Sequence, residues 1–132
     1  MEIVTKALLD PGRLFDQIRK NGAGSVLFHY AVVESQAGDK VSTGIRFEGN
    51  GDMEAELAEI SADIKGRWNV ADVLLVRRIG TLNIGDVISL VAVSSPANTD
   101  AFDACRFGLE RLKKTIGLRK TEMLQGHRKN MP

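Results

Sequence analysis

Two runs rich in valine, leucine and isoleucine, residues 70–79 and 87–93, most constrain how this chain can fold. Residues of this kind favour strands. Between the two runs lies Asn83-Ile84-Gly85-Asp86, a segment typical of a turn. The sequence therefore predicts two strands that follow each other closely and pair in antiparallel fashion.

Three further segments predict strands. Residues 25–33 alternate with a period of two, which places Val26, Phe28, Tyr30 and Val32 on one face. A turn at residues 36–39 leads to a strand at residues 40–47. Residues 2–9 predict a short strand at the start of the chain.

Three helices are expected, and each is marked by a capping residue or an apolar stripe. Asp10 before Pro11 predicts the start of the first helix, with Leu14, Phe15 and Ile18 facing inward and Asn21-Gly22 ending it. Asp52 would cap the second helix, whose stripe is Met53, Leu57, Ile60, Ile64 and Trp68. The third runs from about Thr99 to Ile116, before Gly117, with the stripe Phe102, Cys105, Leu109, Leu112 and Ile116.

This mixture of helices and adjacent strand pairs predicts the α+β class with antiparallel pairing. The 132 residues suffice for one hydrophobic core. We expect a single domain over residues 1–125 and a disordered basic tail over residues 126–132. No apolar run reaches the length of a transmembrane helix, residues 1–10 lack a secretory pattern, and a lone cysteine forms no internal disulfide, so we expect a cytoplasmic protein.

Charge is distributed unevenly along the chain. From Arg106 to Pro132 there are eight Lys and Arg residues and two acids, a net charge of +6, whereas residues 1–105 carry −5. This asymmetry favours an anionic partner at the C-terminal end.

The segment LKKTIGLRKTE, residues 112–122, concentrates these cations on both sides of the expected helix end. Lys113 should lie at the edge of the buried stripe, and Lys120 can fold back beside it. Two ammonium groups held close disfavour each other's charge; a lysine that loses its proton can attack a carbonyl, while the second fixes an anion. Cations are also favoured at helix C-termini, so the spacing alone leaves a simple solvated helix end open.

Other chemistries have little support. His29 and His127 lie far apart, and Cys105 has no CxxC partner, so no metal site is expected. Cys105 lies on the apolar stripe, where a cysteine behaves as a small hydrophobe. The chain contains no nucleotide or nucleophile-elbow motif in the required context, and no cofactor is expected.

Several motifs, in order and with almost no gaps, span residues 24–122. The strongest are Arg78-Ile79-Gly80-Thr81-Leu82-Asn83-Ile84-Gly85-Asp86 and the strand Val91-Ala92-Val93-Ser94-Ser95; others are Gly24-Ser25-Val26, Gly38-Asp39-Lys40-Val41, Ala58-Glu59-Ile60 through Arg67-Trp68, Ala101-Phe102-Asp103-Ala104-Cys105, Leu112-Lys113 and Lys120-Thr121-Glu122. In these motifs the chain resembles the large, catalytic subunit of molybdopterin synthase.

The resemblance implies an α/β hammerhead-like fold with about three helices and a homodimer within a heterotetramer. It implies transfer of sulfur from a thiocarboxylated, ubiquitin-like carrier subunit to cyclic pyranopterin monophosphate, a pterin phosphate, forming the dithiolene of molybdopterin in molybdenum cofactor biosynthesis. The family's two pocket lysines fall on Lys113 and Lys120, which are therefore expected to be catalytic. Substrate contacts are expected for Arg119, Glu122 and Asn98, and neither a membrane nor nucleic acid is expected as a partner.

The chain departs from the family at residues expected to hold the substrate's phosphate. Glu34 stands where the family usually has arginine, Ala97 and Asn98 replace a His-Arg pair, and Arg119 replaces an aromatic residue and would restore part of the lost charge. Two hypotheses follow: an active sulfurtransferase with an altered phosphate site, or a catalytically silent homologue that binds or scaffolds the sulfur carrier. A third, an anion- or nucleic-acid-binding domain, would show strongly salt-dependent binding.

Overall fold

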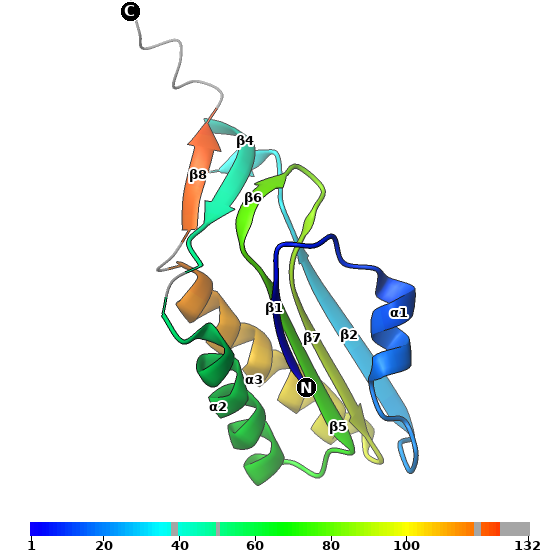
Figure 1. The fold of residues 1–132 in the computed structure, drawn as a ribbon. Helices are drawn as coiled ribbons and strands as arrows, with labels where there is room; N and C mark the ends of the chain where they lie inside the picture. The colour runs from blue at the N-terminus through cyan, green and yellow to red at the C-terminus, as the bar shows by residue number, and fades with distance from the viewer. Residues whose placement is uncertain (38–39, 50, 118–119, 125–132) are drawn as a thin grey trace, which may run out of the picture.

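The computed structural model describes residues 1–37, 40–49, 51–117 and 120–124 (Figure 1). Its larger sheet has four strands in the order β1-β5-β7-β2, whose bounds are Glu2–Thr5, Asp72–Arg78, Val87–Ser95 and Ser25–Val32. β5 pairs with β7, and β7 with β2, in antiparallel fashion, whereas β1 and β5 are parallel. The structure thus confirms the expected antiparallel pairing and adds one parallel pair.

A second sheet continues beyond one end of the first (Figure 1). It contains β3 (Gln36–Ala37), β4 (Lys40–Phe47), β6 (Gly80–Asn83) and β8 (Lys120–Leu124). β4 pairs with each of the other three in antiparallel fashion. The apolar run at residues 70–79 therefore ends in the first sheet, and the next four residues form a separate strand of the second.

Three helices complete the described part of the chain: α1 (Pro11–Gln17), α2 (Met53–Arg67) and α3 (Asn98–Gly117). Alternate residues of the central strands serve opposite faces of the first sheet. Val73, Leu75, Val91 and Val93 pack with α2 and α3, while Leu74, Val76, Leu90 and Ala92 pack with α1. Because both faces are covered, the middle residues of the two strands, 73–76 of β5 and 90–93 of β7, are apolar without alternation.

The predicted helix starts are confirmed. A carboxylate oxygen of Asp10 accepts a hydrogen bond from the Gly12 amide at 3.0 Å, and one of Asp52 accepts from the Ala55 amide at 3.1 Å. The predicted end of the first helix is wrong, because α1 ends at Gln17 and not at Asn21. The residues buried against the sheet are Leu14 and the following Ile18, whereas Phe15 is 41% exposed, with its ring centroid 5.7 Å from that of Phe28 on β2.

The predicted inner face of α3 is partly wrong. Phe102 is 57% exposed, and the buried positions are Ala101, Ala104, Cys105, Gly108 and Leu112. Small residues bring α3 close to the sheet: a Cβ atom at Gly108 would lie 3.1 Å from Val91 Cγ1. The core position of Cys105 is confirmed, and burial raises the pKa of its thiol. The side chain of Ile116 lies outside the described ones.

Val32 departs from the predicted alternation of β2. Val26, Phe28 and Tyr30 pack on the α1 side of the first sheet, as expected. Val32 is exposed, because the pairing register with β7 shifts between Ala31 and Val32. The next residue, Val33, is buried with Ile45, Phe47 and Leu82 in the core of the second sheet.

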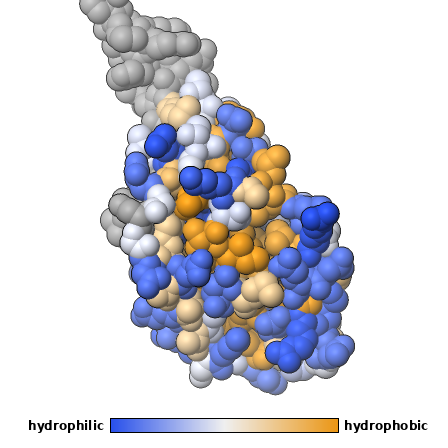
Figure 2. All heavy atoms as spheres, viewed as in Figure 1, coloured by the Kyte–Doolittle hydropathy of each residue, from blue (hydrophilic) through white to orange (hydrophobic). Residues whose placement is uncertain are grey.

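The surface of the molecule combines charged and apolar areas. In Figure 2 hydrophobic residues gather in the middle of the face shown, and hydrophilic residues surround them. Within the described ranges, no helix is long and apolar enough to cross a membrane. The predicted basic tail, residues 126–132, lies outside the described residues.

Candidate functional site

The two lysines singled out by the sequence lie at the same end of the molecule. Lys113 is exposed near the C-terminus of α3, and β8 begins at Lys120, whose backbone pairs with Phe47 of β4. The helix advances about 6 Å from Lys113 to Gly117, and the three peptide units from Gly117 to Lys120 span at most about 11 Å. The α-carbons of the two lysines therefore lie within about 17 Å of each other. The side chain of Lys120 is not among the described ones.

The Lys113 side chain is available to a ligand. It is exposed, and it forms no ion pair with any residue that the structure describes. Its neighbour Lys114 is also exposed but points to a different side of α3, because successive helical residues are rotated by about 100°.

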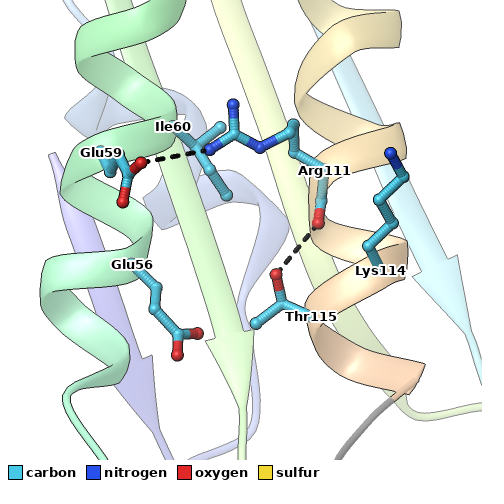
Figure 3. A pocket seen from close by; sticks show the side chains of 6 residues that line it. All are labelled: Glu56, Glu59, Ile60, Arg111, Lys114 and Thr115. Carbon is cyan, nitrogen blue, oxygen red and sulfur yellow. Dashed lines mark hydrogen bonds and ion pairs between the residues drawn. The ribbon is translucent and has the colours of Figure 1, made fainter.

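Lys114 lines an open pocket of about 260 Å³ between α2 and α3 (Figure 3). The other lining residues are Glu56, Glu59, Ile60, Arg111 and Thr115. Lys113 is not among them. The pocket and the lysine site are thus separate features on two sides of one helix.

Arg111 holds the walls of this pocket together. Its Nη1 atom lies 2.6 Å from Asp63 Oδ2, and its Nη2 atom lies 3.9 Å from Glu59 Oε1. Its Cζ atom lies 5.4 Å from the ring centroid of Phe107, within cation–π range. Arg111 of α3 thus forms ion pairs with two acids of α2, and the sequence analysis did not predict this link between the helices. The sequence signal for it is weak, because α2 and α3 each contain both acidic and basic residues.

Asn98 lies at the opposite end of α3. The Ser25 hydroxyl donates a hydrogen bond to Asn98 Oδ1 and so links the start of α3 to β2. Lys113 lies fifteen positions after Asn98, which corresponds to about 22 Å along the helix axis. One chain does not bring these two residues into a common pocket.

The remaining predicted site residues are only partly described. Arg119 lies outside the described residues. Glu122 belongs to β8, where its backbone pairs with Ile45, but its side chain is not described. Glu34 is exposed just after β2, and the Ala97 amide donates to Ser95 Oγ at 3.0 Å.

Two consecutive arginines at the end of β5, Arg77 and Arg78, are buried. Arg77 Nη1 lies 3.5 Å from Glu56 Oε2 on α2. Arg78 Nη2 donates to the Lys6 carbonyl at 3.1 Å, and Arg78 Nη1 lies 3.6 Å from Asp86 Oδ2. Arginine is rarely buried without partners, so two arginines ending a strongly apolar run were a signal that sequence reasoning passed over.

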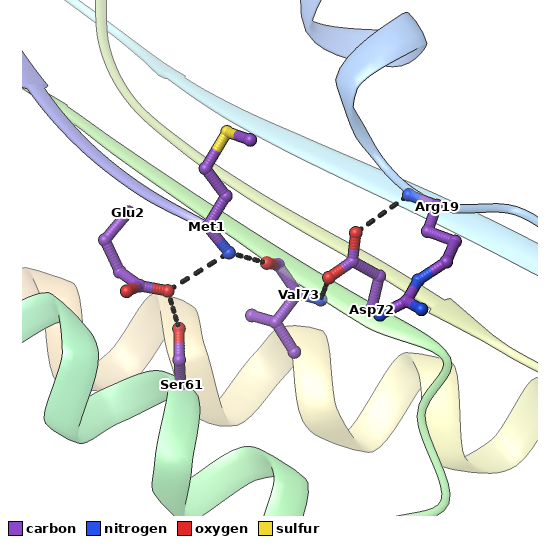
Figure 4. A network of polar contacts seen from close by, with 6 residues as sticks. All are labelled: Met1, Glu2, Arg19, Ser61, Asp72 and Val73. Carbon is purple, nitrogen blue, oxygen red and sulfur yellow. Dashed lines mark hydrogen bonds and ion pairs between the residues drawn. The ribbon is translucent and has the colours of Figure 1, made fainter.

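A polar network holds the start of β1 against β5 and α2 (Figure 4). The backbone nitrogen of Met1 donates to the Val73 carbonyl at 2.7 Å and lies 3.1 Å from Glu2 Oε2. The Ser61 hydroxyl donates to the same carboxylate at 2.9 Å. Burial raises the pKa of Glu2. The hydrogen bonds and the positive charges of Met1 and Lys65 lower this pKa by more than burial raises it, so the net shift is downward.

Known proteins resemble this chain over most of its length. The family model described as MoaE protein matches residues 4–115. The molybdopterin synthase catalytic subunit of Halalkalibacterium halodurans is 32% identical over 111 residues, which cover 83% of this chain and 71% of that protein.

Solved structures agree with this match. The crystal structure of molybdopterin synthase from Staphylococcus aureus superposes with a TM-score of 0.83 at 26% identity, covering 92% of this chain and 90% of the other. A complex of subunits 1 and 2 of the molybdopterin-converting factor from Helicobacter pylori gives a TM-score of 0.64, covering 85% and 77% of the two chains; at 16% identity it supports the fold alone. The hammerhead-like α+β fold expected from the resemblance is confirmed, and the chain belongs to the MoaE family, the catalytic subunits of molybdopterin synthase that act in molybdenum cofactor biosynthesis.

Proposed function

We propose that this chain transfers sulfur from a thiocarboxylated carrier protein to cyclic pyranopterin monophosphate, with Lys113 and Lys120 as catalytic residues. One observation carries the assignment of residues. The exposed Lys113, which pairs with no described acid, is followed after one short connection by Lys120 at the start of β8. Membership of the MoaE family supports the reaction itself.

The two lysines have different roles in this proposal. Lys113 lies closest to the carrier's terminal carbonyl, where an ammonium group stabilises the negative charge that develops on the carbonyl oxygen. Lys120 holds an anionic part of the substrate, and Arg119 and Glu122 beside it complete the contacts with the substrate. Asn98 takes part only if a second copy of the chain supplies it, because about 22 Å of helix separates it from Lys113 of its own chain.

The proposed assembly is a homodimer with one small carrier subunit bound to each chain. Membership of the MoaE family is the support for this carrier partner, and the Helicobacter pylori neighbour is described as a complex of subunits 1 and 2. We propose the cytoplasm as its compartment. The only cysteine, Cys105, is buried and unpaired, as is usual in a reducing environment.

The test is a sulfur-transfer assay with thiocarboxylated carrier and cyclic pyranopterin monophosphate as substrates and the dithiolene as product. Lys113→Ala should abolish product formation and leave folding intact, because an exposed lysine buries mainly its stem. Lys114→Ala is the matched control: it removes the neighbouring lysine of the same helix and should keep activity. If the natural chain binds the carrier and forms no product, the sulfurtransferase is excluded and a silent carrier-binding homologue remains.

A further inference from the structure

We infer that Arg78 is a positioning residue for sulfur transfer, because it fixes the joint between the first sheet, on which the helix with Lys113 packs, and the second sheet, which contains Lys120. The inference rests on the proposed function of Lys113 and Lys120. Arg78 acts through the placement of the second sheet.

Lys113 and Lys120 belong to different parts of the fold. Lys113 lies on α3, which packs against β7 and β2 of the first sheet. Lys120 lies on β8, which pairs only with β4 among the described strands and so moves with the second sheet. The orientation of one lysine relative to the other therefore depends on the angle between the sheets.

The joint itself lies between β5 and β6, where one continuous segment leaves the first sheet and enters the second (Figure 1). Gly80, the first residue of β6, has a φ of 91°, a conformation that residues with a side chain rarely adopt. The amide of Ile79 donates to the carbonyl of Thr5 at the end of β1 at 3.0 Å. The backbone is thus bent and anchored at this point.

Arg78 closes the bend from inside. Its guanidinium donates to the Lys6 carbonyl beyond β1 at 3.1 Å and lies 3.6 Å from Asp86, in the turn between β6 and β7. Asp86 Oδ2 also accepts a hydrogen bond from the Asn83 amide at the end of β6, at 2.9 Å. One side chain therefore connects the strand that enters the second sheet with the turn that leaves it.

The energetics argue for a geometric role. Arg78 is 5% exposed, and its Nε and Nη1 atoms donate no hydrogen bond within the described part of the chain. A buried charge with incomplete hydrogen bonding stabilises a fold poorly, and apolar residues in its place are often neutral or better. A buried charge of this kind more often serves to fix one arrangement of the parts that it connects, here the two sheets around Arg78.

The test compares Arg78→Met with Arg77→Met, two substitutions at consecutive buried arginines of one strand. Arg77 precedes Arg78 and therefore points to the opposite face of β5, where its Nη1 atom lies 3.5 Å from Glu56 Oε2 on α2. Arg78→Met should lower kcat for sulfur transfer about 10- to 100-fold, with a smaller change in the KM for the carrier, because small misplacements of reacting groups are costly. Arg78→Lys, which keeps the cation, should recover part of kcat.

A distance measurement separates positioning from a general loss of structure. Spin labels at Arg106→Cys on α3 and Thr121→Cys on β8, both exposed positions, report the two sheets in a Cys105→Ala background. Mixing the labelled protein with excess unlabelled chain makes a dimer of two labelled chains rare, so the measured distances are those within one chain. Arg78→Met should broaden or shift this distance distribution, and Arg77→Met should leave it unchanged.

Equal kcat and equal distances in the two arginine variants would overturn the inference. If Arg78→Met does not fold, Asp86→Asn tests the same joint, since the asparagine oxygen can still accept from the Asn83 amide. If the natural chain shows no sulfur transfer, the proposed function fails, while the distance measurement still decides whether Arg78 fixes the joint.

Discussion

Arg111 on α3 and Asp63 on α2 form the shortest ion pair between the described helices, with 2.6 Å between Nη1 and Oδ2. The pair is partly exposed, so water weakens it, yet Arg111 also stacks near the Phe107 ring. The two helices that cover one face of the first sheet are thus connected by polar contacts as well as by their buried faces. The connection lies two residues before Lys113.

Removing this connection should destabilise the protein modestly. Arg111→Met should lower the free energy of unfolding by about 1 kcal/mol, the sum of an exposed ion pair and a cation–π contact. Urea unfolding of the single variants and of the double variant with Asp63→Asn measures the coupling between the two residues. Arg106→Met, at an exposed position of the same helix, should change stability by less than about 0.5 kcal/mol. An equal loss in both arginine variants would contradict the role given to Arg111.

Two glycines inside helices should respond in opposite ways to alanine. At Gly108 a Cβ atom would meet Val91 at 3.1 Å and Ile64 at 3.3 Å, whereas at Gly66 it would meet nothing within 4 Å. Gly66→Ala should stabilise the protein by about 0.5–1 kcal/mol through helix propensity. Gly108→Ala should destabilise it by about 1 kcal/mol, because overpacking outweighs the same gain. Thermal unfolding of both variants provides the comparison, and stabilisation by Gly108→Ala would show that α3 does not pack this closely.

Glu2 should make the protein sensitive to acid. The pKa of Glu2 lies below its ordinary value of 4.5, because hydrogen bonds and nearby positive charges outweigh the effect of burial. The contribution of this carboxylate to stability is therefore present above pH 4.5 and is lost as pH falls through the lowered value. Denaturant unfolding from pH 6 down to pH 3 should show a smaller loss of stability for Glu2→Gln than for the natural chain. Parallel curves for the two proteins would contradict this role.

Lys120→Ala should affect substrate affinity more than rate. A charge that holds an anion and does not react contributes to binding in the ground state and the transition state alike, so its loss raises KM. Steady-state kinetics with cyclic pyranopterin monophosphate distinguishes this from Lys113→Ala, which should remove turnover. If Lys120→Ala instead leaves KM unchanged and removes kcat, then Lys120 acts at the reacting carbonyl and does not merely hold the anion.

Glu34→Arg should tighten binding of the pterin phosphate. Glu34 is exposed at the position where the family usually has an arginine, and a carboxylate repels a phosphate that a guanidinium would bind. Product formation by the variant should equal or exceed that of the natural chain at low substrate concentration. Weaker binding by Glu34→Arg would show that this position lies away from the phosphate.

The chain should be a dimer in solution. Large apolar side chains remain exposed in the single chain, including Leu8 at 76% and Phe102 at 57%. Apolar surface of this kind is commonly covered in an assembly. Sedimentation should give twice the mass of one chain at micromolar concentration. A stable monomer would exclude Asn98 from the lysine site, because only a second chain can bring it there.

The sequence by itself determined where most elements begin and what kind they are. Asp10 and Asp52 mark helix starts because a cap bonds to amides only two or three residues away. The apolar runs that became β5 and β7, and the position of Cys105 in the core, also follow from short-range pattern. The lysine pair was found in the same way, since one short segment contains both residues.

Only the tertiary structure decided how these elements meet. Phe102 lies outside and Gly108 inside because contact with Val91 and Ile64 selects small residues on α3, a preference that a stripe of large apolar residues does not reveal. Asn98 and Lys113 are separated by the length of one helix, although the resemblance places both at one site. Arg78 is buried because strands from two sheets meet around it. Its partners there are Lys6, which lies far away in the sequence, and Asp86, which lies in the turn that follows β6. Caps and periodicity act within a few residues, whereas packing joins residues from the whole chain, so only the folded molecule shows which faces and charges come together.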